Sequence, residues 1–172
     1  AQSFDEKTTN SSNVRLNVSN SGTYGNAMRG YRDGSGNPSG EYPAGSGVEH
    51  VFESGIWFGG LINGSTVAVS TASVDAPQGY STGSSGFEFY PEPGDVLREI
   101  SSLRNSPFYS PSAISHQDFI ATYSDRNVQV PGTQTQIAGH LDPLNVEVTS
   151  RSYNWNYSFS DFFVILDFEI EN

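Results

Sequence analysis

The sequence predicts an all-β protein, an antiparallel β-sandwich or jelly-roll-like domain with long Gly/Ser/Pro-rich loops and at most one short helix. Three observations lead to this fold class. The 172 residues include 18 glycines, 9 prolines and 13% aromatic residues, which is typical of short strands joined by turns. Long windows rich in Ala, Leu, Glu and Lys, as helices favour, are absent from the sequence. An Asn63-Gly64 pair separates two β-rich runs, as in a tight hairpin.

Residues 55–72 are expected to form this hairpin with a two-residue type I′ turn. That turn sets the register and places Phe58 opposite Val69. Because side chains alternate along a strand, one face is expected to join the core. It would carry Ile56, Phe58, Ile62, Val67 and Val69. Trp57 and Leu61 would lie on the other face, where we expect something else to cover them.

A second hairpin is predicted from Leu144–Tyr157 and Phe162–Glu171, with residues 158–161 as its loop. Four loop residues place Tyr153 opposite Leu166, and a change of one residue would break this match. Tyr153, Trp155 and Tyr157 would then share one face. These rings are either part of the core or a platform on which a sugar can stack.

One segment, Asp95–Leu103, has the features of a short helix. Asp95 is a suitable N-cap, and Val96, Ile100 and Leu103 recur at helical spacing.

Residues 1–12 are polar and are expected to form a flexible or exchanged N-terminal arm before a single domain at 13–172. Val14, Leu16 and Val18 alternate with polar residues, so they predict a half-buried strand. Such a strand can add to the sheet edge of a neighbouring molecule. The last residues also keep strand character. Either the chain is a fragment or ends in a marginal strand, or another molecule completes the sheet.

The charge balance argues against several partners. The sequence contains eight Lys and Arg residues and nineteen Asp and Glu residues, for a net charge of −11. Proteins that bind phosphate groups need the opposite balance, so we expect no nucleic acid partner. The longest apolar run, Phe162–Leu166, is far shorter than the ~20 residues that span a bilayer, so no membrane insertion is expected.

The chain begins Ala-Gln-Ser without Met, which resembles a mature end left after signal-peptide removal. With few lysines and many Ser, Thr, Asn and Tyr residues, this predicts an extracellular or cell-surface protein. Four Asn-x-Ser tripeptides are candidate glycosylation sites, although such tripeptides also arise by chance. They begin at Asn10, Asn17, Asn63 and Asn156, and Asn63 is expected at a hairpin tip.

No catalytic constellation is assigned, and we expect the chain not to be an enzyme. The three histidines, His50, His116 and His140, lack metal-ligand spacing, and no G-x-S-x-G elbow occurs. His116 and His140 each precede an aspartate by two residues. These pairs are either metal ligands or, more simply, hydrogen-bonded loop histidines.

No cofactor is expected, although one further stretch of the sequence brings calcium into question. Asp33, Ser35 and Asn37 place oxygens at alternate positions, as at the start of a calcium loop. Pro38 stands where that loop needs glycine, and Ala44 where it needs glutamate. A Gly-rich turn is the simpler interpretation.

The alternating carboxylates of Asp167, Glu169 and Glu171 are predicted to lie on a solvated edge of the sheet.

Two blocks of the sequence resemble a known family. The first runs from Glu41 to Ser70 and includes Ser-Gly-Ile-Trp-Phe-Gly-Gly and Asn-Gly-Ser-Thr-Val-Ala-Val-Ser. The second runs from Gly139 through Tyr157, followed by Asp161–Leu166. Both are similar to the N-terminal β-rich region of large secreted surface proteins of Gram-negative bacteria, which often end in a type IX secretion sorting domain. The resemblance implies export and a β-rich surface domain, and no catalytic residues.

Together these features predict a structural subunit of an extracellular bacterial filament or surface assembly. Copies would join by β-strand addition through Val14, Leu16 and Val18, as a homo-oligomer with the form of an open helical filament, and would carry glycans. The alternative is a carbohydrate-binding or adhesive surface module that uses Tyr153, Trp155 and Tyr157.

Overall fold

The computed structural model describes residues 4–25, 38–51, 53–73 and 86–172. Every regular element in these residues is a β-strand, and every pairing between named strands is antiparallel. The predicted all-β class is therefore confirmed. The finer assignment to a sandwich or a jelly roll stays a prediction.

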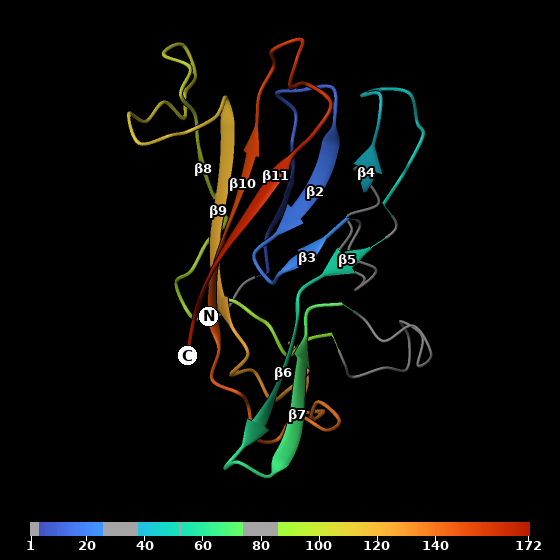
Figure 1. Cartoon of the computed structure of the whole chain (residues 1–172), viewed down its shortest axis with the longest axis vertical. Helices are drawn as coiled ribbons and strands as arrows, with labels where there is room; N and C mark the ends of the chain where they lie inside the picture. Colours follow the sequence, from blue (N-terminus) through green and yellow to red (C-terminus); the bar gives the residue numbers. More distant parts are fainter. Residues whose placement is uncertain (1–3, 26–37, 52, 74–85) are drawn as a thin grey trace.

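The strands form three sheets (Figure 1). The first has the order β1 (Glu6–Thr8), β2 (Arg15–Ser19), β3 (Thr23–Tyr24) and β5 (Ser54–Gly55), with β4 (Gly40–Glu41) also paired to β2. The second has the order β11 (Ile165–Glu171), β10 (Glu147–Asn154), β9 (Gln117–Ser124) and β8 (Arg98–Ile100). The third is a hairpin of β6 (Trp57–Ile62) and β7 (Thr66–Thr71), which extends to the lower end of the long axis in Figure 1.

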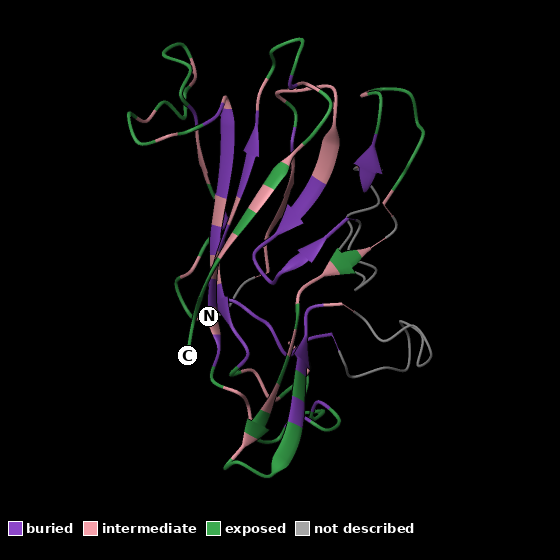
Figure 2. Ribbon diagram, in the orientation of Figure 1, coloured by how far each residue is buried: buried purple, intermediate pink, exposed green. Residues whose placement is uncertain are grey.

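The core lies where the first two sheets meet, shown by the buried stretches of β2, β3 and β9 in Figure 2. Val18 and Tyr24 come from the first sheet, and Phe119 and Tyr123 from β9. The ring of Tyr24 meets that of Phe168 edge to face at 5.9 Å. Apolar side chains that alternate along each strand thus fill the space between the sheets.

The N-terminal segment, predicted as a flexible or exchanged arm, is paired within its own chain over the described residues 4–12, and exchange between copies stays a prediction. β1 pairs with β2 of the same chain, with Lys7 opposite Val18. Thr9 is fully buried, and its N–H donates to the carbonyl of Leu16 at 2.9 Å. The N–H of Asn10 donates to a side-chain oxygen of the β9 residue Gln117 at 2.8 Å.

The β6–β7 turn has the predicted conformation but a different register. Asn63 and Gly64 have φ values of 51° and 72°, and the N–H of Ser65 donates to the Ile62 carbonyl at 3.2 Å. However, Ile62 pairs with Thr66, because Ser65 belongs to the loop. A shift of one residue exchanges the faces of β7. The predicted inner positions of Val67 and Val69 are therefore wrong.

The C-terminal hairpin is also shifted by one residue. Tyr153 pairs with Ile165 rather than with Leu166, and the strands are joined by residues 155–164 instead of four loop residues. Leu166 and Phe168 then pack against the core, while Ile165 faces outward. The predicted shared face of Tyr153 and Leu166 is wrong.

The segment predicted as a helix, Asp95–Leu103, contains the edge strand β8. Glu99 of β8 lies opposite Phe119 of β9, and Leu97 just before β8 is buried. The N–H of Asp95 donates to the carbonyl of Glu92 at 3.1 Å, in a turn that precedes the strand. Pairing with β9 satisfies the backbone of this segment and overrides its helical spacing.

Candidate functional site

One face of the β6–β7 hairpin is apolar and open to solvent. Trp57, Leu61, Val67 and Val69, here called the hairpin surface, are 68%, 60%, 74% and 49% exposed. Their common orientation follows from the register, which pairs Leu61 with Val67 and puts Val69 opposite Gly59. Between Glu53 and Asp75 the sequence has no charged residue. The hairpin surface is therefore both apolar and uncharged.

The opposite face of this hairpin is fastened to the second sheet by a buried carboxylate. Asp125 follows β9 and is fully buried. Its Oδ2 accepts hydrogen bonds from the Ser70 hydroxyl at 2.7 Å and from the Leu144 N–H at 2.8 Å. Its Oδ1 accepts the N–H of Val146 at 2.8 Å. The charge-assisted bond from Ser70 thus ties the hairpin to a carboxylate that Leu144 and Val146 hold in place.

A second apolar surface lies on the connection between β10 and β11 and on the first residue of β11. It consists of Tyr157, Phe159, Phe162, Phe163 and Ile165, here called the aromatic surface, and all five side chains are exposed. Between Arg151 and Asp167 the one charged residue in the sequence is Asp161. Within this surface is a hollow of about 260 Å³, lined by Trp155, Tyr157, Phe159, Ser160, Phe163 and Ile165.

Ring contacts and hydrogen bonds hold the aromatic surface in shape. The rings of Tyr157 and Phe159 stack at 5.4 Å with an interplanar angle of 7°. The ring of His116 approaches Tyr157 at 4.6 Å, and its Nδ1 accepts the N–H of Asn156 at 3.0 Å. The N–H of Ser160 donates to the Tyr157 carbonyl at 2.8 Å and closes a turn. The exposed rings are thus ordered by their own neighbours.

The two surfaces lie at opposite ends of the molecule. In Figure 1 the β6–β7 hairpin forms the lower end of the long axis, and the β10–β11 connection reaches its upper end. The ends differ in shape, since one is a projecting two-stranded hairpin and the other contains a hollow.

The three rings predicted as a sugar platform do not form one. Tyr153 is buried, Trp155 is half-buried, and Tyr157 is exposed with one ring face against Phe159. Burial raises the pKa of Tyr153, with Asp167 adding to the effect. Sequence reasoning missed Phe159, Phe162 and Phe163 as surface residues, because it assigned Phe162 and Phe163 to a strand. Three phenylalanines within five residues were the available signal.

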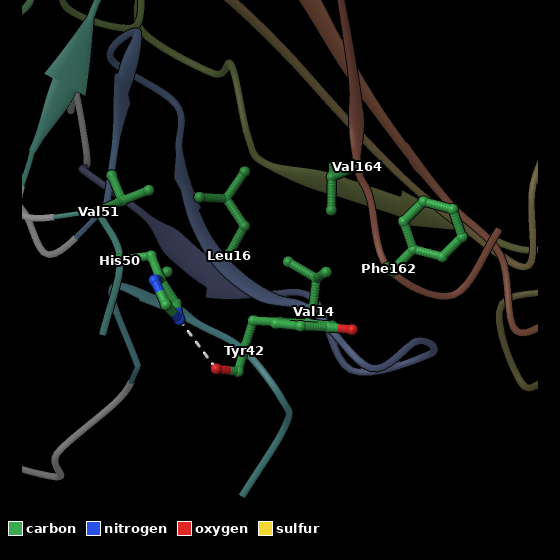
Figure 3. A pocket seen from close by; sticks show the side chains of 8 residues that line it. Val14, Leu16, Tyr42, His50, Val51, Phe162 and Val164 are labelled. Atoms are coloured by element: carbon green, nitrogen blue, oxygen red, sulfur yellow. Dashed lines mark hydrogen bonds between the residues drawn. The ribbon is translucent and has the colours of Figure 1, made fainter. Parts of the chain in front are cut away.

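Two of the predicted assembly residues line a hollow within their own chain. Val14 and Leu16 face Phe162 and Val164 across a space of about 290 Å³, which Figure 3 shows from close by. Val18 is buried in the core. β2 already pairs with β1 on one side and with β3 and β4 on the other. Within the described chain this strand is therefore used in its own sheet, and its donation to a neighbour stays a prediction.

The Asn-x-Ser sites differ in accessibility. Asn10, Asn63 and Asn156 are exposed, and Asn63 lies at the hairpin tip as predicted. Asn17 is fully buried in β2, which removes it as an acceptor in the folded protein. The exposed Asn63 and Asn156 adjoin the hairpin surface and the aromatic surface, respectively.

The three histidines and one of the two aspartates that the sequence brought into question, Asp118, make internal hydrogen bonds. The Asp118 carboxylate accepts the N–H groups of Ile114 and Ser115 at 2.7 and 2.8 Å. His140 is buried and its Nε2 bonds the Asp125 carbonyl at 2.6 Å. Within the described residues, no group of three or more His, Cys, Asp or Glu side chains could hold a metal ion. The candidate calcium residues 33–37 lie outside the described residues.

The carboxylates along β11 are partly neutralised. Arg151 of β10 lies between Asp167 and Glu169, at 3.7 and 2.8 Å from their oxygens. The hydrogen bond to Glu169 raises the pKa of Arg151.

Among the described residues, none forms a helix long and apolar enough to cross a membrane.

Comparison of the chain with protein families, with curated proteins and with solved structures finds no match. The resemblance to secreted surface proteins of Gram-negative bacteria thus stays a prediction.

Proposed function

We propose that this chain is a structural subunit of an extracellular assembly and joins copies of itself end to end. The observation that supports this proposal is the pair of uncharged apolar surfaces at opposite ends of a strongly acidic chain. Large exposed apolar patches on a soluble domain generally mark sites of association.

The net charge supports contact through these two surfaces. Copies with a net charge of −11 repel one another over most of their surface. The hairpin surface contains no charged residue and the aromatic surface has a single acid, Asp161, beside it. Close approach therefore costs least there. A contact between two different surfaces is heterologous, and repetition of it produces an open chain of subunits unless the rotation closes a ring.

The experiment is to follow the mass of the purified chain by light scattering over a range of protein and salt concentrations, with negative-stain images of each sample. Salt screens the repulsion between acidic copies, so assembly should increase with ionic strength. Elongated particles whose mass increases with concentration are expected. A monomer under all conditions, with no fibres in the images, would overturn the proposal.

A second candidate function is carbohydrate binding at the aromatic surface. Phe159 is 74% exposed and rests on the parallel ring of Tyr157, so its outer face is open to a flat partner such as a sugar ring. A glycan array should then show binding that Phe159→Ala removes. No binding across the array would exclude this function.

A further inference from the structure

We propose that the hairpin surface of one copy docks into the aromatic surface of the next copy, with the Trp57 side chain in the hollow beside Phe159. This inference rests on the proposed self-assembly and names the contact that carries it. Three features of the two surfaces support it.

The first feature is shape. The β6–β7 hairpin projects from one end of the molecule, and its largest exposed side chain is Trp57. The opposite end contains a hollow of about 260 Å³, large enough for one bulky side chain. Trp57 stands at the first pair of the hairpin, opposite Thr71, and its exposed indole matches a hollow with aromatic walls. Aromatic side chains in such pockets often dominate the binding energy of an interface.

The second feature is rigidity. The Ser70 hydroxyl ties the hairpin to the Asp125 carboxylate, which is itself held by the N–H groups of Leu144 and Val146. The hollow is shaped by the stacked rings of Tyr157 and Phe159. Because both surfaces are held in place in the free subunit, docking loses little conformational freedom.

The third feature is charge, which favours this pairing over contact between two aromatic surfaces. Asp161 lies beside the aromatic residues, so two aromatic surfaces brought together would bring two carboxylates close to each other. The hairpin brings no charge to the contact. The aromatic surface therefore accepts a hairpin at lower electrostatic cost than it accepts a second aromatic surface.

The test uses two variants of the full chain, Trp57→Glu and Phe159→Glu. Both positions are mostly exposed, so folding should be preserved, and urea unfolding checks this. Each variant alone should be monomeric, with association weakened at least about 30-fold, as expected for a central aromatic residue. A mixture of the two should form a dimer that grows no further, because it retains one intact hairpin and one intact hollow.

The control variant is Val96→Glu, at a residue that is 61% exposed and outside both surfaces. It should assemble like the unmodified chain. Assembly by either variant alone would overturn the hairpin-to-hollow contact, and Phe159→Glu dimers would indicate contact between two hairpins. A mixture that stays monomeric would also overturn it. All these outcomes leave self-assembly intact, whereas a monomeric unmodified chain would overturn the proposed function itself.

Discussion

Replacing Asp125 with Asn should weaken the attachment of the β6–β7 hairpin and lower the free energy of unfolding by about 3 kcal/mol. The side chains have nearly the same shape, so the change tests hydrogen bonding rather than packing. Asp125 is fully buried and accepts three hydrogen bonds, from Ser70, Leu144 and Val146. An amide has one acceptor oxygen, so it cannot reproduce this pattern.

The magnitude follows from those three bonds. A hydrogen bond to a charged group contributes roughly 1.5–3 kcal/mol and a neutral one roughly 0.5–1.5 kcal/mol, so two retained bonds lose about 1 kcal/mol each. With the amide oxygen in the place of Oδ2, the bonds from Ser70 and Leu144 are retained, and the Val146 N–H would face the new NH₂ without an acceptor, at a cost of about 1–3 kcal/mol. A neutral amide costs less to bury than a carboxylate, and this difference offsets part of the sum. The net loss in the free energy of unfolding is about 3 kcal/mol.

The assay is urea unfolding, followed by circular dichroism, with hydrogen exchange of the β6 and β7 amides as a local probe. Asp142→Asn is the matched control, since Asp142 is exposed and undergoes the same chemical change. We expect faster exchange in the hairpin for the Asp125 variant only. Equal unfolding midpoints for the two variants, with unchanged hairpin exchange, would refute the role assigned to Asp125.

Two further predictions concern the core and the start of the hairpin. Burial raises the pKa of Tyr24 from 10.0 to about 12. Folding thus favours the protonated form of Tyr24. The stability that this form contributes is fully present below pH 10 and is lost as the pH rises toward 12. Between pH 9 and pH 11 the free energy of unfolding of the unmodified chain should fall by about 1.4 kcal/mol more than that of Tyr24→Phe. Equal losses in the two proteins would show that Tyr24 is not the cause. At Gly55 an added Cβ would lie 2.5 Å from the Ser73 hydroxyl and 2.9 Å from its nitrogen. Gly55→Ala should therefore destabilise by about 1–3 kcal/mol in urea unfolding. Gly59→Ala should not destabilise the chain, because its Cβ would come no nearer than 4.0 Å to the Ala68 carbonyl. Similar urea midpoints for the two variants would argue against crowding at Gly55.

The turn and the register of the central hairpin differ in how well the sequence predicts them. Asn63 and Gly64 adopt positive φ because their own chemistry permits it, and this conformation was predicted correctly. The register depends on whether Ser65 pairs with Ile62, and packing of the whole strand decides that. With Ser65 in the loop, Ala68 becomes buried and Val69 exposed. The apolar face that we propose as a docking surface could not be identified without this shift.

The Asp95–Leu103 segment shows the same division. Its apolar residues recur at helical spacing, but the spacing is equally compatible with a short strand in which Leu97 is buried. The segment forms a strand rather than a helix because the edge of β9 is available to it. Pairing at that edge satisfies backbone groups and also buries Leu97. Local spacing carries no information about a strand some twenty residues further along the chain.

The all-β class, the turn at Asn63-Gly64, the acidic balance and the strand at β2 could all be predicted without a structure. These follow from composition, from the conformational preferences of single residues and from alternation along one strand. Tertiary structure decided the two hairpin registers, the burial of Asn17, the use of β2 within its own sheet and the gathering of aromatic rings at one end. These depend on contacts between distant segments, and a change of one residue in pairing exchanges the buried and exposed faces of a strand.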